Sequence, residues 1–229
     1  AEITRETGNP AVETLAADLS SQADIRRLAD EIHQKYPHID VLVNNAGAVF
    51  LDRRESVDGI EMTLALNHLG YFLLTNLILD ILKASAPARI VSVSSDAHAH
   101  ADFDFDDPEG KKKYNGLKAY AQSKLANLLF TFELAKRLEG TGVTVNALHP
   151  GFVQTNFFAG NGRLGAFFRW AHKSFGTPAV FAARPLLYLA TSPEVAGVTG
   201  RYYDWPRRRS LARHLPGSKA ARDEAAAKR

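Results

Sequence analysis

The strongest constraint on the fold of this 229-residue sequence is an alternation of short apolar runs with longer amphipathic stretches. The amphipathic stretches predict helices at residues 20–36, 59–84, 117–138 and 177–190. The apolar runs between them predict buried strands at residues 12–17, 39–43, 89–93, 143–148 and 200–203. Strands that alternate with such helices form a parallel sheet covered on both faces. We therefore expect a single α/β domain over residues 1–229, with a doubly wound parallel sheet.

Composition and charge narrow the functional classes. The chain has no cysteine, which excludes disulfides, thiolate catalysis and cysteine-based zinc sites. No apolar run reaches the roughly 18–20 residues that span a bilayer, and residues 1–20 contain no secretory leader, so we expect a cytoplasmic protein. The net charge is +3, and much of the excess lies in a basic tail at residues 206–229. We interpret that tail as a solvated surface segment and expect no nucleic-acid partner, because acids and bases are interspersed elsewhere.

Tyr120 and Lys124 are four residues apart in a predicted helix, which places both on one face. A free tyrosine has a pKa near 10, too high for an efficient base at neutral pH. A nearby ammonium favours the phenolate and lowers that pKa, so the pair suits proton transfer in carbonyl and alcohol chemistry. By spacing alone, however, an ordinary surface pair is the commoner explanation.

Three motifs at predicted strand ends change that estimate. Residues 44–47 read Asn-Asn-Ala-Gly, and a turn of small residues lets the backbone approach a ligand closely. Ser94 and Ser95 place hydroxyls at the end of the next strand. Residues 149–151 read His-Pro-Gly at the end of the strand after that. Since ligands of open α/β sheets bind beyond the carboxyl ends of the strands, the motifs predict a ligand site there.

Together and in this order, the motifs resemble those of the short-chain dehydrogenase/reductase family. The resemblance covers nearly all of residues 1–205. It is similar in detail to the retinol dehydrogenase-like branch over Leu66-Asn67-His68-Leu69-Gly70, Arg89 to Ser95, Tyr120 to Asn127 and His149-Pro150-Gly151. It implies a Rossmann-like fold and an NAD(P)-dependent oxidoreductase that interconverts a lipophilic alcohol and its carbonyl compound by hydride transfer. A homodimer is implied by the family's habit of pairing through long helices.

The resemblance also implies roles for individual residues. Tyr120 would be the general acid/base, and Lys124 would hold the nicotinamide ribose and lower the Tyr120 pKa. Ser95, rather than its neighbour Ser94, would hydrogen-bond the substrate oxygen. Asn67 would support a water that relays protons to Lys124. The cofactor would be NADP or NAD, with NADP favoured. The implied cofactor-binding residues are Asp18, Leu19, Asn44, Ala46, Gly47, Tyr120, Lys124, Pro150, Gly151, Val153 and Thr155. Among them, Asp18 would contact the adenine end, Asn44, Ala46 and Gly47 would line the adenosine ribose, and Pro150, Gly151 and Thr155 would flank the nicotinamide.

The sequence departs from the family in one respect. The family's glycine-rich turn, Thr-Gly-x-x-x-Gly-x-Gly, receives the cofactor pyrophosphate at a helix N-terminus, and this sequence contains no such turn. Residues 1–7 resemble the end of the helix that follows the family's second strand. We therefore interpret the chain as N-terminally truncated, without the first two strands and first helix, and expect it by itself to fold poorly or bind cofactor weakly. The alternative function is a catalytically weak or inactive dinucleotide-binding or regulatory protein. The presence of Asn67, Ser95, Tyr120 and Lys124 disfavours a third class, an assembly subunit.

Other polar and aromatic residues have simpler interpretations. His98, His100 and Asp102 lack a further ligand set, so we interpret them as part of a polar loop at residues 96–115 and predict no metal site. We interpret His149 as a residue that shapes its turn. The segment 152–176 is expected to be mobile or lid-like, and its aromatic residues as a group favour a bulky apolar substrate. These aromatic residues are Phe157, Phe158, Phe167, Phe168, Trp170 and Phe175.

Overall fold

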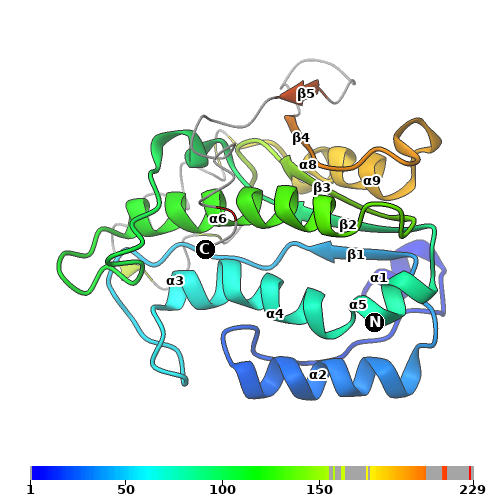
Figure 1. Ribbon diagram of the computed structural model, residues 1–229, viewed down its shortest axis with the longest axis horizontal. Helices are drawn as coiled ribbons and strands as arrows, with labels where there is room; N and C mark the ends of the chain where they lie inside the picture. Colours follow the sequence, from blue (N-terminus) through cyan, green and yellow to red (C-terminus); the bar gives the residue numbers. More distant parts are fainter. Residues whose placement is uncertain are drawn as a thin grey trace.

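The computed structural model describes residues 2–154, 157, 161–162, 174, 176–204, 213–215 and 227. These residues form a five-stranded sheet in the order β1–β2–β3–β4–β5 (Figure 1). The first four strands are parallel, and β5 pairs with β4 in the antiparallel direction. The strands are β1 (Val41–Asn44), β2 (Ala88–Val93), β3 (Val143–His149), β4 (Arg201–Asp204) and β5 (Arg213–Leu215). The predicted α/β architecture with a Rossmann-like parallel sheet is therefore confirmed.

The strand predicted at residues 12–17 is wrong. Those residues have no regular secondary structure, whereas the other four predicted strands are present within two residues of their expected bounds. A β-strand is held by hydrogen bonds to a neighbouring strand. Within the described part of the chain, the sheet ends at β1, and residues 12–17 have no strand beside them. An apolar run without a pairing partner cannot form a strand, whatever its local propensity.

Two helices follow the sequence closely. Helix α2 (Gln22–Lys35) begins after Ser21, whose Oγ accepts a hydrogen bond from the backbone N–H of Asp24 at 3.3 Å. Helix α6 (Gly116–Arg137) begins after Asn115, whose Oδ1 accepts from the N–H of Lys118 at 3.0 Å. Such caps satisfy backbone donors that a first helical turn leaves without partners. A short helix, α1 (Glu2–Thr7), precedes them.

The helix predicted at residues 59–84 is divided into four parts. It comprises α3 (Met62–Leu64), the π-helical turn η1 (Ala65–Leu69), α4 (Gly70–Leu77) and α5 (Leu79–Ala84). Gly70 is where a side chain would not fit, because a Cβ there would lie 2.6 Å from the carbonyl oxygen of Leu19. The helix therefore packs its backbone directly on the segment before α2. A π-turn inside a helix often marks a functional position.

The remaining helices are short. The helix predicted at residues 177–190 forms as α8 (Ala179–Ala182) and α9 (Arg184–Thr191), and the 3₁₀ turn η3 (Pro193–Val195) follows. The stretch predicted as a loop at residues 96–115 begins instead with the 3₁₀ helix η2 (Asp96–His100). Its cap explains the difference, since the Oγ of Ser95 accepts from the N–H of Ala97 at 3.2 Å.

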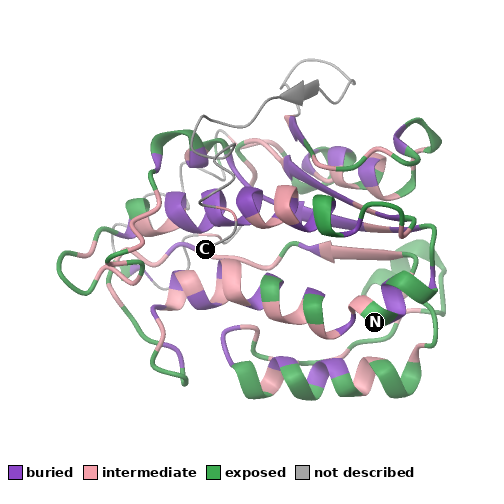
Figure 2. Ribbon diagram, viewed as in Figure 1, coloured by how far each residue is buried: buried purple, intermediate pink, exposed green. Residues whose placement is uncertain are grey.

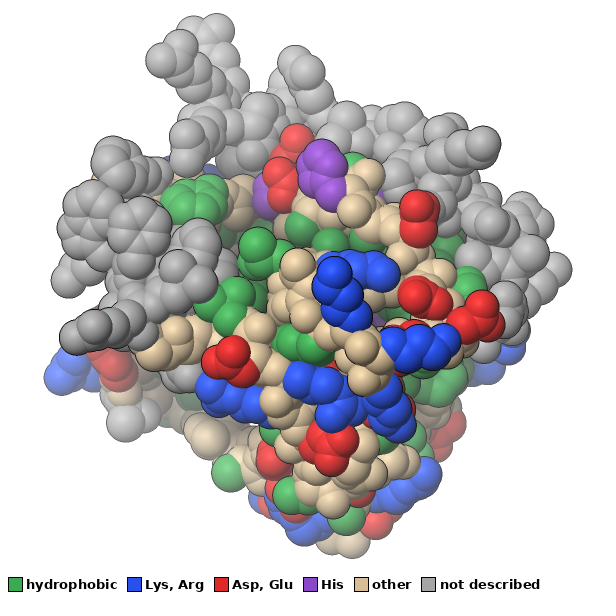
Figure 3. Space-filling model, turned by 90° about the vertical axis from the view of Figure 1, so that its left-hand side faces the viewer, with side chains coloured by type: hydrophobic (Ala, Val, Ile, Leu, Met, Phe, Trp, Pro, Cys, Tyr) green, Lys and Arg blue, Asp and Glu red, His purple; other side chains and the backbone are tan. Residues whose placement is uncertain are grey.

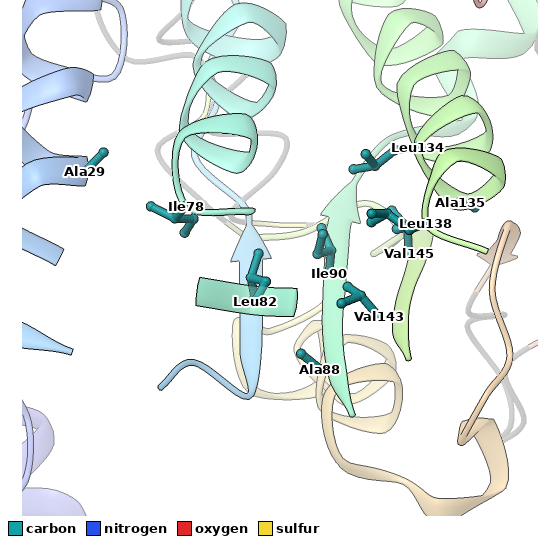
Figure 4. Packing of buried hydrophobic residues seen from close by; sticks show 10 residues of the cluster. All are labelled: Ala29, Ile78, Leu82, Ala88, Ile90, Leu134, Ala135, Leu138, Val143 and Val145. Carbon is teal, nitrogen blue, oxygen red and sulfur yellow. The ribbon is translucent and has the colours of Figure 1, made fainter. Parts of the chain in front are cut away.

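The core lies between the sheet and the helices on its two faces. One face of the sheet packs on α2, α4, α5 and α6 through a ten-residue cluster (Figure 4), and α8 and α9 cover the other face. Side chains of β2 alternate between these two sides, with Ile90 in the first cluster and Val91 in the second. Figure 2 shows that α6 is buried along most of its length, whereas α2 exposes its outer face. Helix α6 is thus a central element, and it carries both Tyr120 and Lys124.

Two predictions fall largely outside the described residues. They are the lid-like segment at 152–176 and the basic tail at 206–229. Of the first, Val153 forms a bridge with Thr177 at the base of α8. Within the part of the chain that the structure describes, no helix combines the length and apolar character needed to cross a membrane.

Candidate active site

A pocket of about 1070 Å³ lies at the carboxyl ends of β1, β2 and β3. Strand β1 points to the left in Figure 1, and Figure 3 shows that side of the molecule, where Lys and Arg side chains alternate with acidic ones. The pocket brings together residues from segments far apart in the sequence. Seven predicted site residues line it, namely Gly47, Ser95, Tyr120, Lys124, Pro150, Gly151 and Val153.

Lys124 is buried at the back of this pocket, with 2% of its surface exposed. Its Nζ donates a hydrogen bond to the carbonyl oxygen of Val93, at the end of β2, at 3.0 Å. The same nitrogen lies 5.7 Å from the ring centroids of both Tyr120 and Tyr71. Burial lowers the pKa of Lys124 from its ordinary value to about 7, because a charged ammonium loses its hydration inside the protein. Lys124 is therefore close to the boundary between charged and neutral at physiological pH.

Burial is the main influence on the pKa of Tyr120 in this structure. The pKa is raised to about 12, mostly by burial and slightly by the charge of Asp96, while the Ser95 side chain acts in the opposite direction. The expectation that Lys124 lowers this pKa stays a prediction; the Lys124 Nζ donates to Val93, and the lysine is itself strongly desolvated. The ring of Phe157 lies edge-on to the Tyr120 ring, with centroids 5.2 Å apart.

The two serines at the end of β2 have different roles. Ser94 donates from its Oγ to the carbonyl oxygen of Lys124 at 2.8 Å, so its hydroxyl ties β2 to α6. Ser95 donates to a carboxylate oxygen of Asp96 at 3.1 Å and lines the pocket together with Tyr120. Asp96 in turn faces His149, with 3.7 Å between the carboxylate and Nε2. The Ser94 hydroxyl is thus engaged with the backbone of α6, and the predicted role of Ser95 toward the substrate oxygen stays a prediction.

Asn67 lies behind the pocket, on the π-helical turn η1, and is fully buried. Its side chain forms two hydrogen bonds to Ala48, accepting from the N–H and donating to the carbonyl oxygen, each at 2.9 Å. The Asn67 side chain also donates to the Oγ of Ser123 at 3.1 Å. The backbone carbonyl oxygen of Asn67 accepts from the side-chain amide of Asn127 at 2.9 Å. Asn67 therefore fastens the turn after β1 to helix α6. Its predicted role in supporting a water stays a prediction.

Four predicted cofactor residues do not line the pocket. They are Asp18, Leu19, Asn44 and Ala46. Asp18 accepts from both the backbone N–H and the hydroxyl of Ser20, and these bonds lower its pKa below the ordinary value. Asn44 donates to Thr75 at 3.0 Å inside the core. The polar atoms of these two side chains thus have local partners here. The predicted residue Thr155 lies outside the described residues.

Asn161 was not identified from the sequence, and the structure gives His98 a contact within the core. Asn161 is buried and holds the loop after β1, accepting from the N–H of Leu51 at 2.8 Å and donating to the carbonyl oxygen of Val49 at 2.7 Å. Nothing local in the sequence marks it, because its partners are about 110 residues away. His98 is buried against the ring of Tyr202 at 5.1 Å. Within the described residues no group of three or more His, Cys, Asp or Glu side chains is arranged to hold a metal ion.

A comparison with protein families bears on this arrangement. Residues 1–163 match the family model described as short chain dehydrogenase. That match covers well over half of the chain. The chain belongs to the short-chain dehydrogenase family.

Two curated relatives indicate one branch of this short-chain dehydrogenase family. The chain is 47% identical to retinol dehydrogenase 14 of Homo sapiens over 196 residues, covering 81% of this chain and 56% of the relative. It is 43% identical to retinol dehydrogenase 13 of Homo sapiens over 231 aligned positions, covering 96% of this chain and 69% of the relative. The chain thus spans little more than half to about two thirds of the length of these curated relatives. The predicted resemblance to the retinol dehydrogenase-like branch is confirmed.

Solved structures agree with this short-chain dehydrogenase fold. An uncharacterized protein from Mycobacterium Paratuberculosis superimposes with a TM-score of 0.77 at 33% identity, covering 99% of this chain and 75% of its own. The RhlG/NADP active-site complex of Pseudomonas aeruginosa superimposes with a TM-score of 0.62 at 29% identity, covering 88% of this chain and 78% of its own.

The family implies a nicotinamide cofactor, and the pocket residues fit its nicotinamide half. A Cβ at Gly47 would lie 3.0 Å from Asn67 Oδ1 and 3.6 Å from Lys124 Nζ, so the glycine leaves room beside both side chains. Lys124 offers buried donors there, and the turn at Pro150 and Gly151 forms another part of the wall. Of the residues predicted for the adenosine half, Gly47 lines this pocket, whereas Asp18, Asn44 and Ala46 do not.

Proposed function

We propose that the pocket interconverts a lipophilic alcohol and its carbonyl compound with NADP or NAD as cofactor. The observation that carries the proposal is the association of three side chains at one pocket. Tyr120 and Ser95 both line the pocket, and the buried Lys124 lies beside the Tyr120 ring. This trio joins the end of β2 to α6, and Ser95 and Tyr120 are 25 residues apart in the sequence.

The proposed chemistry divides between cofactor and protein. The bound nicotinamide would supply or accept the hydride, and the protein supplies placement and proton transfer. With a pKa of about 12, the Tyr120 phenol carries its proton at neutral pH. It is therefore set up to donate that proton to a carbonyl oxygen during reduction. Ser95 would donate a hydrogen bond to the same oxygen and hold it in place.

Lys124 and the turns around it would hold the cofactor. The Lys124 ammonium would donate to the ribose hydroxyls, and Gly47, Pro150, Gly151 and Val153 would contact the nicotinamide end. NADP is favoured over NAD because the Pseudomonas aeruginosa structure similar to this chain is an NADP complex.

The lining of the pocket supports an apolar substrate. Tyr120 and Ser95 are surrounded by large apolar side chains from several segments. Two of the most similar relatives carry the name retinol dehydrogenase, which also supports a lipophilic alcohol or carbonyl substrate. The apolar side chains in question are Val49, Leu117, Leu148, Phe152, Val153, Phe157 and Leu186.

The test is NADPH oxidation against a panel of retinoid, steroid and xenobiotic carbonyl compounds. Tyr120→Phe removes only the reacting hydroxyl, so we expect kcat to fall by about 100- to 10,000-fold while NADPH binding, followed by fluorescence, stays unchanged. Tyr36→Phe is the matched control, since its hydroxyl donates to Glu13 away from the pocket, and it should retain normal turnover. Near-normal kcat in Tyr120→Phe would refute the role of Tyr120.

A second function is favoured by one observation. Asp18 and Asn44, which the family resemblance assigns to the adenine end, are engaged in hydrogen bonds to Ser20 and Thr75. A catalytically weak dinucleotide-binding or regulatory protein would bind NADPH only weakly in the titration and turn over none of the carbonyl compounds.

A further inference from the structure

Tyr71 is a buried aromatic residue that neither the sequence motifs nor the proposed reaction uses. It lies on α4, with 2% of its surface exposed. Its ring centroid is 5.7 Å from the Nζ of Lys124, a distance at which an aromatic ring attracts a cation. Its hydroxyl has no hydrogen-bond partner among the described residues. The hydroxyl thus explains little about why a tyrosine is there, whereas the ring has a definite neighbour.

The surroundings of Lys124 give this contact weight. In the described part of the chain, its Nζ makes one hydrogen bond, to the carbonyl oxygen of Val93, and no ion pair with a carboxylate. The rings of Tyr71 on α4 and Tyr120 on α6 both lie 5.7 Å from this nitrogen. The other titratable group near it is His68 on η1, whose pKa is lowered by burial and by the Lys124 charge. The two aromatic rings are therefore the principal groups that can replace water around this ammonium.

We propose that Tyr71 is a positioning residue for Lys124, whose aromatic ring stabilises the charged ammonium between helices α4 and α6. The physical reason is the negative electrostatic face of an aromatic ring, which gains strength when the cation is desolvated. In the proposed function Lys124 binds ribose hydroxyls as an ammonium donor, so the proposal rests on that function for its purpose. The contact itself does not depend on it.

Because the pKa of Lys124 lies near neutral pH, a contact with the Tyr71 ring can change the fraction of the lysine that is charged. Burial alone has already brought the pKa of Lys124 to about 7. Near that point, a modest change in the stabilisation of the charged form alters the charged fraction at neutral pH severalfold. A stabilising contact with the Tyr71 ring would therefore raise the share of Lys124 that is ammonium when the cofactor arrives.

The decisive measurement is the pKa of Lys124 itself, from ¹³Cε shifts of labelled lysine during a pH titration of the full chain without cofactor. Tyr71→Phe retains the ring and should change this pKa by less than about 0.3. Tyr71→Leu removes the ring but retains apolar bulk, and the pKa should fall by roughly one pH unit. Phe72→Leu is the matched control, because Phe72 neighbours Tyr71 on α4 but is 46% exposed, and it should change nothing.

A merely structural role for Tyr71 predicts a different pattern. Tyr71→Leu would then alter stability and leave the Lys124 pKa unchanged, which would overturn the proposal. If Tyr71→Leu does not fold, fluorinated phenylalanines at position 71 keep the shape and weaken the ring face stepwise. The pKa should fall with each added fluorine, and a flat series would also overturn the proposal. Because the readout is a titration, a protein without turnover still gives an answer, so failure of the proposed function is distinguished from failure of this inference.

Discussion

Replacing Lys124 by methionine tests the energetic reading of the site most directly. The wild-type protein buries an ammonium whose pKa falls from 10.5 to about 7. At about 1.36 kcal/mol per pH unit, that difference corresponds to ~5 kcal/mol of destabilisation when the lysine is charged. Lys124→Met removes this cost but also leaves the Val93 carbonyl oxygen without its partner, a loss of about 1–3 kcal/mol. We therefore expect the variant to be more stable than wild type by about 2–4 kcal/mol near and below pH 7.

The same comparison has a predicted pH dependence. Between about pH 7 and pH 10.5 the unfolded chain holds a proton on Lys124 that the folded chain has released, so the contribution of Lys124 to stability rises with pH. The cost is full below pH 7 and disappears above pH 10.5. The advantage of Lys124→Met should thus shrink by about 1.4 kcal/mol per pH unit across this window.

The assay is urea unfolding of wild type and Lys124→Met at intervals from pH 6.5 to pH 9.5. Titrating groups that do not interact with Lys124 are shared by both proteins and cancel in the difference. The variant should also lose NADPH binding, because the ribose would lose its donor. A stability difference that does not vary with pH, or a variant that is less stable at pH 7, would show that burial of the Lys124 charge is not the dominant energy here.

Three further predictions concern the scaffold that holds the site. Gly116→Ala should destabilise the protein by more than about 2 kcal/mol, because a Cβ at this position would collide with backbone atoms. These atoms are the Phe50 carbonyl oxygen and Leu51 Cα, the latter at 2.6 Å. A thermal unfolding midpoint equal to that of the wild type would contradict this prediction. Leu82→Ala, in the fully buried cluster under the sheet, should cost about 2–5 kcal/mol in urea unfolding, and a loss below about 1 kcal/mol would mean that the site collapses around the cavity. Ser21→Ala removes the cap of α2 and should cost about 1 kcal/mol, with the glycine variant recovering most of the loss.

The resemblance predicted that Tyr120, Lys124 and Ser95 lie close together, and all three line the pocket, because their positions depend on short-range patterns. The four-residue spacing in a regular helix puts the first two on one face, and a strand end puts Ser95 beside them. The residues assigned to the adenine end followed the same motifs but do not reach the pocket. Their side chains have nearer partners, in Ser20 for Asp18 and Thr75 for Asn44, and a linear pattern does not reveal such competition.

The secondary-structure predictions likewise succeeded where they depend on local sequence and failed where they depend on tertiary contacts. The amphipathic pattern of α2 and its cap Ser21 are local, and the helix forms where it is predicted. The run at residues 12–17 has the same apolar character as the true strands, yet it is not one, because pairing depends on what lies beside it in the sheet. The π-turn that carries Asn67 was also not predictable, since a continuous apolar pattern does not show where a helix widens.

The sequence by itself determined the alternating α/β architecture, the family and the side chains that stand at the strand ends, because periodicity and motif order are properties of neighbouring residues. The tertiary structure alone decided the electrostatics of the site. It placed Tyr71 from α4 against Lys124 from α6, fastened the turn after β1 through Asn67, and buried Lys124 until its pKa fell to about 7. Desolvation and long-range contact depend on how the whole chain packs, so they exist only once the helices and strands have come together.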